Sequence, residues 1–233
     1  MFPDKNLRSG EGGGDPVAPV PNKGRGRRKM PKGSKELENQ RREEIVDACE
    51  RLYAVRSFKD ITIKDIGGET SFTRTSIYNY FVNKEEIFLA LFAREYMRWG
   101  DALQEAAERG GSGAEEFADV VAASLAERPF MLKLLAMNMY DMEDSSRQER
   151  LVEFKRAYAR TMDNMRACYA AFFPADDGAE SFILSFYPFL FGIYPYTSVT
   201  EKQRSAMDAV GMTYALPSVY ELARETILKL LGK

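Results

Sequence analysis

The side chains best suited to chemistry in this sequence lie between residues 73 and 84, and they form hydrogen bonds rather than break covalent ones. They carry hydroxyl, guanidinium and amide groups: Thr73, Arg74, Thr75, Ser76, Tyr78 and Asn79. Arginine can contact phosphate or guanine, asparagine can contact phosphate or adenine, and hydroxyls can contact phosphate oxygens or base edges. Lys84 adds a cation beside a helix start, where it is suited to clamp a phosphate. The segment favours recognition of duplex DNA; a helical hairpin with an ordinary polar outer face is the alternative.

The sequence lacks the residues that most enzymes need. Its 233 residues include no histidine, which removes the commonest general base and the commonest zinc ligand. Cys49 and Cys168 cannot build a disulfide framework or a four-sulfur metal site. Carboxylate pairs such as Glu43 and Glu44 are typical of solvated helix faces. We therefore expect a protein that is not an enzyme and that needs no cofactor and no metal.

The side chains between residues 73 and 84 are positioned by three helix starts that share one sequence pattern. At three places between residues 61 and 87, an apolar residue precedes a capping side chain and another apolar residue follows the cap by four positions. This pattern is a hydrophobic staple around an N-cap. It predicts two short helices, Ile63–Glu69 and Arg74–Tyr80, joined by a turn at 70–72 and packed on a first helix over Lys35–Arg56. Two short helices after a long one predict a helix-turn-helix unit.

The residues of this unit resemble the DNA-binding domain of the tetracycline-repressor (TetR) family. The resemblance covers about residues 38–92 and is most specific in the string Tyr78-Asn79-Tyr80-Phe81 followed by Lys84-Glu85-Glu86. It implies an N-terminal three-helix DNA-binding domain, a larger helical domain for ligand binding and dimerisation, and a two-fold dimer. Members of the family are usually repressors that release DNA when a small molecule binds the second domain.

Carried over by position, the resemblance also implies roles for single residues. Thr62 would contact phosphate at the start of the second helix. Arg74 and Thr75 would lie nearest the bases at the start of the recognition helix, beside Thr73. Contacts to the DNA backbone would come from Tyr78, Asn79, Tyr80 and Lys84.

Departures from the family pattern affect the packing of the unit. The turn has Thr70-Ser71 where the family usually has Ala-Gly, and Phe72 replaces a smaller aliphatic residue, so we expect looser or rearranged packing there. Gly67 and Gly68 lie inside the predicted second helix, where each costs about 0.5–1 kcal/mol relative to alanine. A close approach of two helices would explain Gly67, whereas nothing in the sequence explains Gly68.

Helical periodicity dominates the rest of the sequence and strand-like alternation is nearly absent, which predicts an all-α fold. The predicted helices cover 83–109, 114–127, 129–140, 146–173, 179–194, 201–211 and 216–231. We expect a disordered basic arm at 1–34, a helix-turn-helix DNA-binding domain at 35–82, and a helical effector-binding and dimerisation domain at 83–233. The net charge of −2 conceals this division, because residues 1–36 carry nine Lys or Arg and four Asp or Glu. Whether the arm contacts DNA is left open.

Beyond residue 95 the resemblance is architectural, so expectations there rest on residue type. An effector pocket for a small, mostly apolar molecule is expected from adaptable and aromatic side chains: Trp99, Met137, Tyr140, Tyr158 and Met162. A homodimer interface is expected from apolar and aromatic side chains of the last helices: Phe182, Phe186, Phe189, Tyr220 and Ile227. Packing in the core of one protomer is the alternative for each of these residues.

The twenty residues from Ser181 to Thr200 are uncharged and long enough to span a membrane. They contain Pro188, Pro195 and Gly192, so a buried, interrupted helix is the better interpretation, with no membrane partner and a cytoplasmic location. The sequence thus predicts a homodimeric, sequence-specific transcriptional regulator, with release of a repressor from a palindromic operator as the expected mode. The alternative is a helical ligand-binding or protein-interaction module whose DNA-binding domain is vestigial.

Overall fold

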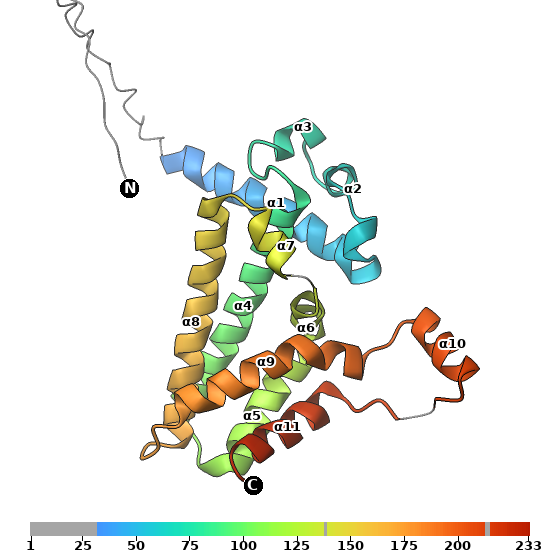
Figure 1. Ribbon diagram of the computed structural model, residues 1–233. Helices are drawn as coiled ribbons and strands as arrows, with labels where there is room; N and C mark the ends of the chain where they lie inside the picture. The colour runs from blue at the N-terminus through green and yellow to red at the C-terminus, as the bar shows by residue number, and fades with distance from the viewer. Residues whose placement is uncertain (1–31, 138, 213–214) are drawn as a thin grey trace, which may run out of the picture.

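The computed structural model describes residues 32–137, 139–212 and 215–233, and within them every regular element is a helix (Figure 1). The prediction of an all-α fold is therefore confirmed. A small unit at one end begins with α1 (Lys32–Val55), and a larger bundle is built on α4 (Lys84–Arg109). The arm expected at 1–34 falls almost entirely on residues outside the described part of the chain.

The small unit contains a short 3-10 turn and three helices: α1, η1 (Phe58–Asp60), α2 (Ile63–Gly68) and α3 (Arg74–Ile77). Its core consists of buried apolar side chains from all three helices and their connections: Ile45, Cys49, Ile61, Ile66, Ile77 and Phe81. The Thr62 hydroxyl accepts from the Asp65 N–H in a capping box, and the Asn83 side chain accepts from the Glu86 N–H. The predicted helix-turn-helix unit therefore forms, with two of its three predicted caps.

α3 is shorter than the sequence predicts. The predicted helix runs to Tyr80, whereas the regular α-helix ends at Ile77 and the chain continues in turns. The Ile77 carbonyl accepts from both the Tyr80 and the Phe81 N–H, at 2.8 and 3.0 Å, which tightens the chain. The Thr73 hydroxyl makes no capping bond and pairs with the Ser76 hydroxyl at 3.1 Å. α3 is therefore held by the packing of the unit rather than by its own cap.

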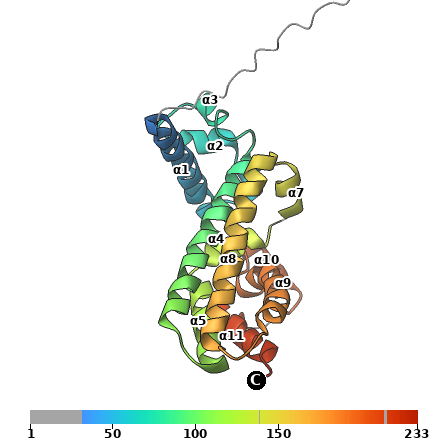
Figure 2. The ribbon, with the colours of Figure 1, turned by 90° about the vertical axis from the view of Figure 1, so that its left-hand side faces the viewer.

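Two long helices, α4 and α8 (Gln148–Phe172), run side by side in the same direction and form the spine of the larger bundle (Figures 1 and 2). They approach closely at Gly100, where a Cβ would lie 3.1 Å from Thr161 Oγ1. The Thr161 hydroxyl donates to the Tyr96 carbonyl, and the Asn164 side chain donates to the Gly100 carbonyl, both at 2.8 Å. One close-packed pair thus connects the end that carries α3 with the opposite end of the molecule.

Five further helices cover this spine: α5 (Gly113–Ala126), α6 (Pro129–Leu135), α7 (Met139–Asp144), α9 (Ala179–Thr197) and α11 (Val219–Leu230). The prediction of one helix over 129–140 is wrong, because α6 ends at Leu135 and a separate α7 extends into the residues between the predicted helices 129–140 and 146–173. α7 packs against α4, and the buried side chain of Met142 anchors it there. α7 has six residues and only Met142 of them is buried, so it is too short for a helical period of apolar residues to mark it in the sequence.

The C-terminal helices depart from the bundle and return to it. α9 continues to Thr197, with Pro188 and Pro195 inside the helix. α10 (Glu201–Ala209) projects from the bundle, and none of its residues is buried (Figure 1). α11 then packs against α5 and α9. No single helix in the described part of the chain has the length and apolar composition of a membrane span. Only α9 and α10 taken together have that length and composition, and the chain bends by 72° between them.

Candidate nucleic-acid interface

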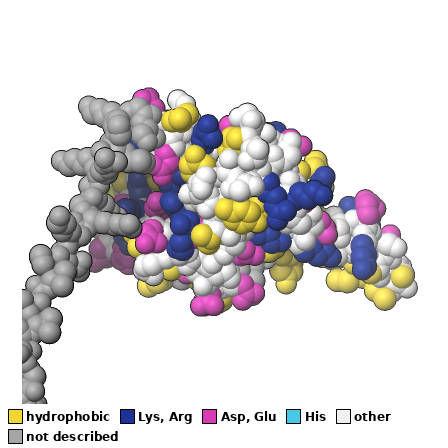
Figure 3. Space-filling model, turned by 90° about the horizontal axis from the view of Figure 1, so that it is seen from above, with side chains coloured by type: hydrophobic (Ala, Val, Ile, Leu, Met, Phe, Trp, Pro, Cys, Tyr) yellow, Lys and Arg dark blue, Asp and Glu magenta, His cyan; other side chains and the backbone are white. Residues whose placement is uncertain are grey.

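The exposed end of the small unit carries most of the side chains predicted to contact DNA. Five of them, on α3 and beside it, are exposed: Thr73, Arg74, Thr75, Tyr78 and Asn79. Ile77 of the same helix is fully buried in the core of the unit, and Thr62 is exposed at the start of α2. Seen from this end, several Lys and Arg side chains gather on the face (Figure 3). The fold thus leaves accessible the hydrogen-bonding groups that can read DNA.

The accessible side chains differ in how far they are already engaged. The Arg74 guanidinium lies 3.4 Å from the Tyr78 hydroxyl, one helical turn away, which leaves most of its five donors free. By contrast, the Thr62 hydroxyl donates to the Asp65 carboxylate and accepts from the Asp65 N–H at 3.2 Å. The Thr62 hydroxyl and N–H both donate to the Asp65 carboxylate, and these two bonds hold the pKa of that carboxyl below its ordinary value. Thr62 therefore fixes the start of α2, and a phosphate would have to share its hydroxyl.

Lys84 does not occupy the position that the sequence predicts for it. Its ammonium donates to the carbonyl oxygens of Phe58 and Ile61, at 2.9 and 3.2 Å, and lies 4.0 Å from the centre of the Phe58 ring. Two of the three donors of the ammonium are thus used inside the unit. Lys84 therefore ties α4 to the segment before α2, and its charge points into the unit instead of toward a phosphate.

The turn before α3 accommodates its unusual residues through contacts at the surface of the unit. The ring of Phe72 lies 6.4 Å from that of Tyr80, and the Arg41 guanidinium lies 5.3 Å from the Phe72 ring centre. The Ser71 N–H and hydroxyl both donate to the Glu44 carboxylate of α1. Tyr80 is half-buried by this packing, so it is less accessible to DNA than the other predicted contacts.

The two glycines of α2 differ in what surrounds them. A Cβ on Gly67 would lie 3.2 Å from the Arg74 Cα and 3.3 Å from the Arg74 Cβ, so α2 and α3 approach most closely at this position. A Cβ on Gly68 would meet nothing within 4 Å. Close helix approach therefore explains Gly67, as the sequence predicts, and packing does not explain Gly68.

This difference predicts unlike results for two matched substitutions. Gly67→Leu overpacks the approach of α2 to α3 and should cost about 1–3 kcal/mol of unfolding free energy while displacing the backbone of Arg74. Gly68→Leu places its side chain in open space, so it should be neutral or gain up to about 0.5–1 kcal/mol by removing a helical glycine. Urea unfolding followed by circular dichroism measures both. Equal losses at the two positions would show that α2 and α3 are not in close contact at Gly67.

The turn that follows α3 is held by the start of α8. The fully buried Glu86 carboxylate accepts from the Arg147 N–H, Nε and Nη2, at 2.9, 2.7 and 2.7 Å, and from the Val82 N–H at 3.0 Å. Arg147 Nη2 also donates to the Tyr80 carbonyl at 3.0 Å. Burial alone would raise the pKa of Glu86, but the hydrogen bonds from Arg147 and Val82 hold its pKa below the ordinary value. A charged, paired Glu86 thus fastens the larger bundle to the chain just after α3.

Two further contacts join the small unit to the bundle. The Asn83 side chain donates to the Ser145 carbonyl, at 2.6 Å, in the connection between α7 and α8. The Lys133 ammonium of α6 donates to the Tyr53 carbonyl at 2.7 Å and to the Arg56 carbonyl at 3.4 Å, where a cation offsets the negative end of α1. The sequence contains no local signal for these contacts, because their partners are 62 to 80 positions apart.

A cavity of about 580 Å³ lies between α7, α8 and α9 and includes part of the predicted effector pocket. Of the five predicted residues, only Tyr140 and Tyr158 line it. Trp99 and Met162 are instead buried in the core of the bundle, and Met137 accepts a hydrogen bond from a tyrosine of α1. Residue type alone does not separate a cavity wall from a core contact, so three of the five predicted residues lie elsewhere.

Tyr187 also lines this cavity, although its residue type did not mark it as a pocket residue in the sequence. The Tyr187 side chain is buried, and its hydroxyl has no hydrogen-bond partner among the described residues. Its ring packs against those of Trp99 and Tyr158, at centroid distances of 5.7 and 6.0 Å. Burial raises the pKa of Tyr187 well above its ordinary value, so the hydroxyl stays protonated and remains a donor. The rest of the wall contains apolar side chains, Met139, Ile183, Leu184, Pro188 and Phe191, and one ion pair, Lys155–Glu143, at 2.6 Å.

Three of the predicted dimer residues lie in the core of the protomer. Phe182 and Phe186 of α9 are buried there, as is Ile227 of α11, so these three side chains follow the alternative of packing within one protomer. Phe189 is half-buried, with its ring 5.8 Å from that of Phe186, and the Tyr220 hydroxyl donates to an aspartate of α5 at 2.8 Å. Both faces of α9 contain apolar residues. The spacing of apolar residues in the sequence therefore cannot show which face of the helix points into the core.

The other face of α9 is exposed and uncharged. Its residues follow helical spacing: Ser181, Leu184, Ser185, Pro188, Phe191, Gly192, Pro195 and Tyr196. The Leu184 side chain is 74% exposed and that of Tyr196 is 64% exposed. Exposed apolar residues on an uncharged helix face are typical of protein interfaces. We call this set the outward face of α9.

Comparison with known proteins matches both parts of the chain. Residues 45–91 match the family model described as "Bacterial regulatory proteins, tetR family". Residues 93–231 match the model described as "Tetracyclin repressor-like, C-terminal domain", which alone covers more than half of the chain.

Similar proteins carry helix-turn-helix regulator names. The chain is 25% identical over 127 residues to the HTH-type transcriptional regulator BetI of Brucella canis, which covers 54% of this chain and 64% of BetI. It is 36% identical over 58 residues to the uncharacterized HTH-type transcriptional regulator YfiR of Bacillus subtilis, covering 25% of this chain and 28% of YfiR. The chain thus spans less than two thirds of the length of these relatives.

A solved structure shows the same fold over both parts. A TetR transcriptional regulator from Rhodococcus sp. RHA1 superposes with a TM-score of 0.54 at 12% identity, over 83% of this chain and 97% of that one. A helix-turn-helix unit precedes a helical bundle in both molecules, as the two family models require. The chain therefore belongs to the TetR family of transcriptional regulators.

Proposed function

We propose that this chain represses transcription in the cytoplasm as a homodimer, which binds a palindromic operator through α3 and leaves it when a small, mostly apolar effector binds the larger bundle. In this proposal it acts by binding and not by catalysis. The proposal rests on the hydrogen bonds of Arg147, at the start of α8. Arg147 donates to the Tyr80 carbonyl, just after α3, and to the Glu86 carboxylate. A DNA-reading helix that is fastened to a ligand-binding bundle can be repositioned by the ligand.

On the DNA side, the proposal assigns base contacts to Arg74 and Thr75. The exposed hydroxyl and amide groups nearby would contact phosphates, namely those of Thr62, Thr73, Tyr78 and Asn79. The proposal assigns no phosphate contact to Lys84, because its ammonium donates to carbonyl oxygens inside the unit. In a two-fold dimer two copies of α3 would enter successive major grooves, which requires a palindromic site.

Selection of bound fragments from random duplex DNA tests this function. We expect the full chain to enrich a palindromic sequence, with an affinity that falls steeply as salt is raised, because phosphate contacts release counterions. Failure to enrich any sequence would contradict the proposal and favour a ligand-binding or protein-interaction module with a vestigial DNA-binding domain.

The same selection tests the proposed dimer interface, which is the outward face of α9. Leu184→Arg places a charge inside this interface, so the variant should sediment as a monomer and lose the palindrome. Leu184 also lines the proposed effector cavity, but the selection contains no effector, so the loss reports on the interface. The protomer should fold normally, because Leu184 is 74% exposed within it. Val210→Arg is the matched control, since Val210 is a comparably exposed apolar residue beyond α10, and it should remain dimeric. A palindrome enriched equally well by Leu184→Arg would rule out this interface.

The proposed effector site is the cavity between α7, α8 and α9. Its apolar side chains and the unpaired Tyr187 hydroxyl fit a mostly apolar molecule with one acceptor, such as a carbonyl or ether oxygen, while the charges of Lys155 and Glu143 in the wall neutralise each other. The short connection that joins α7 to α8, two helices that line the cavity, carries Ser145 and Arg147, which hold the chain after α3. Movement of α7 or α8 on effector binding would therefore be passed to α3.

Tyr187→Phe tests whether the hydroxyl at this site lacks a partner. A buried donor without an acceptor costs about 1–3 kcal/mol, so its removal should leave the unfolding free energy of the ligand-free protein unchanged or raise it. Tyr220→Phe is the matched control; its hydroxyl donates to Asp119 at 2.8 Å, and its loss should lower the unfolding free energy by about 1 kcal/mol. Equal losses in the two variants would show that the Tyr187 hydroxyl is already satisfied and cannot be reserved for an effector.

A further inference from the structure

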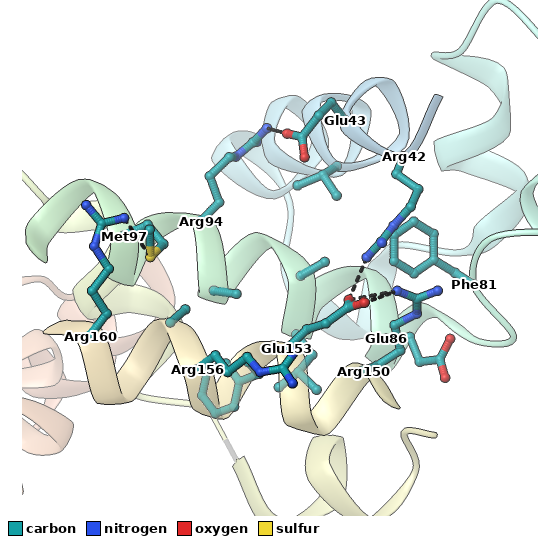
Figure 4. A pocket seen from close by; sticks show the side chains of 16 residues that line it. Arg42, Glu43, Phe81, Glu86, Arg94, Met97, Arg150, Glu153, Arg156 and Arg160 are labelled. Atoms are coloured by element: carbon teal, nitrogen blue, oxygen red, sulfur yellow. Dashed lines mark hydrogen bonds and ion pairs between the residues drawn. The ribbon is translucent and has the colours of Figure 1, made fainter. Parts of the chain in front are cut away.

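A second cavity, of about 510 Å³, lies between α1, α4 and α8, at the junction of the small unit and the bundle (Figure 4). It is separate from the proposed effector site, and the two share no lining residue. Its floor is apolar, with side chains from both parts of the molecule: Val46, Phe81, Leu89, Ala90, Ala93 and Phe154.

Positive charge is in excess on one side of this cavity. Arg42 of α1 and Arg150 of α8 both bind the Glu153 carboxylate, each at 2.7 Å, and Figure 4 shows the three side chains converging. Arg156 lines the same cavity and forms no ion pair with any described residue. Arg42 and Arg150 thus share one carboxylate, Arg156 is paired with none, and the fully buried Glu86 nearby is already paired with Arg147.

The positive charges at the other end of the cavity are compensated. Arg94 pairs with Glu50 and with two further carboxylates of α1, and Arg160 pairs with Asp101 at 2.8 Å. The excess is therefore confined to the side where Arg42, Arg150 and Arg156 meet the apolar floor.

The donors of this cavity also outnumber its acceptors. The Nε–H groups of Arg94 and Arg150 are both buried, and neither has an acceptor among the described residues. Buried donors normally have a partner, so the unpaired Nε–H of Arg150, on the side where positive charge is in excess, indicates that this arginine is not fully satisfied by the protein alone. The unpaired donor is an observation separate from the ion pairs, and both indicate a ligand that offers negatively charged acceptor atoms.

We propose that this cavity binds an amphipathic organic anion: a carboxylate or sulfonate among Arg42, Arg150 and Arg156, attached to an apolar body that lies on the floor. Guanidinium groups suit such anions because they offer paired, charge-assisted donors. The phosphate backbone of a nucleic acid does not fit, because it has no apolar part to cover the floor. A ligand here contacts α1 and α8 together, so it would stiffen the junction between the DNA-binding unit and the bundle.

Two dyes of nearly the same shape test the proposal on the full chain. 8-Anilinonaphthalene-1-sulfonate carries one sulfonate, and N-phenyl-1-naphthylamine is the same molecule without it. We expect the sulfonate to bind one site per chain about tenfold more tightly than the neutral dye, and this advantage should shrink as salt is raised. Equal affinity for the two dyes would overturn the proposal. The assay contains no DNA, so its outcome is independent of operator binding.

Variants locate the bound dye. Arg156→Ala, at an exposed position, should weaken the sulfonate about threefold to fivefold and leave the neutral dye unchanged. Ala93→Trp fills the floor and should abolish both; unfolding curves check that this variant still folds. Tyr140→Ala alters the wall of the effector cavity and should change neither affinity. Loss of binding in Tyr140→Ala with no change in Arg156→Ala would place the dye in the effector cavity and refute the site.

Discussion

Replacing Arg147 with alanine should lower the unfolding free energy by about 3 kcal/mol. The change removes both guanidinium bonds and leaves the Glu86 carboxylate buried, with the backbone N–H groups of Val82 and of residue 147 as its remaining partners. Breaking a buried ion pair costs about 3–5 kcal/mol, and the lower end applies because 42% of the Arg147 side chain is exposed and water can enter the space. Urea unfolding at neutral pH measures the loss. As a control, Lys229→Ala removes an exposed pair with Glu225 and should change the value by less than about 0.5 kcal/mol.

A second substitution separates the buried charge from the lost contact. In the double variant Glu86→Gln/Arg147→Ala the buried group is neutral and can still accept from the Val82 N–H. The double variant should therefore be more stable than Arg147→Ala alone. Losses that simply add would mean that Glu86 and Arg147 do not interact.

The dependence on pH gives a second readout of the same pair. In the native chain the pKa of Glu86 lies below its ordinary value of 4.5, so its contribution to stability is present above that value and is lost as pH falls through the lower folded pKa. In Arg147→Ala burial dominates and raises the pKa of Glu86, so stability should instead increase as pH falls through that raised value. Parallel stability curves for the two proteins between pH 4 and 6 would contradict the assignment.

Arg74→Ala should be the most damaging single change to DNA binding. An arginine that reads a base contributes about 1–3 kcal/mol, and a dimer on a palindrome presents two copies, so about 2–6 kcal/mol should be lost. The unfolding free energy should hardly change, because Arg74 is exposed and its contact with Tyr78 is long. Fluorescence anisotropy with the selected operator, and with operators changed by one base pair in each half, measures affinity and base preference together.

The control for this prediction removes the same charge elsewhere. Arg204→Ala lies on α10, away from the helix-turn-helix unit, and should leave operator affinity unchanged at the same salt concentration (Figure 1). If Arg74→Ala retains both the affinity and the base preference of the native chain, α3 does not read the operator through this residue.

The parts of the fold that could be predicted from the sequence are those fixed by neighbouring residues. The starts of α2 and α4 follow from Thr62 and Asn83, because a cap and its staple lie within five positions of each other. The close approach at Gly67 was also predictable, since a glycine inside a helix costs stability unless it makes room for something.

The parts that could not be predicted depend on partners far away in the chain. Lys84 has the residue type of a phosphate clamp, but its acceptors are carbonyls of a 3-10 turn that no sequence pattern marks. Arg147 meets Glu86 across 61 positions, and nothing near either residue indicates the pairing. Tyr187 could not be separated from the other aromatic residues of α9, because its distinguishing property is a missing partner rather than a residue type.

The exposed position of α10 makes it a place where the chain can be divided. Because no residue of α10 is buried, a break in the backbone there would remove no part of the core. α11 lies beyond such a break but is anchored by its own buried residues, Ala223 and Ile227, against α5 and α9. The molecule could thus be made as two complementary fragments that assemble into one bundle, with α10 as the place where a fluorescent reporter can be inserted.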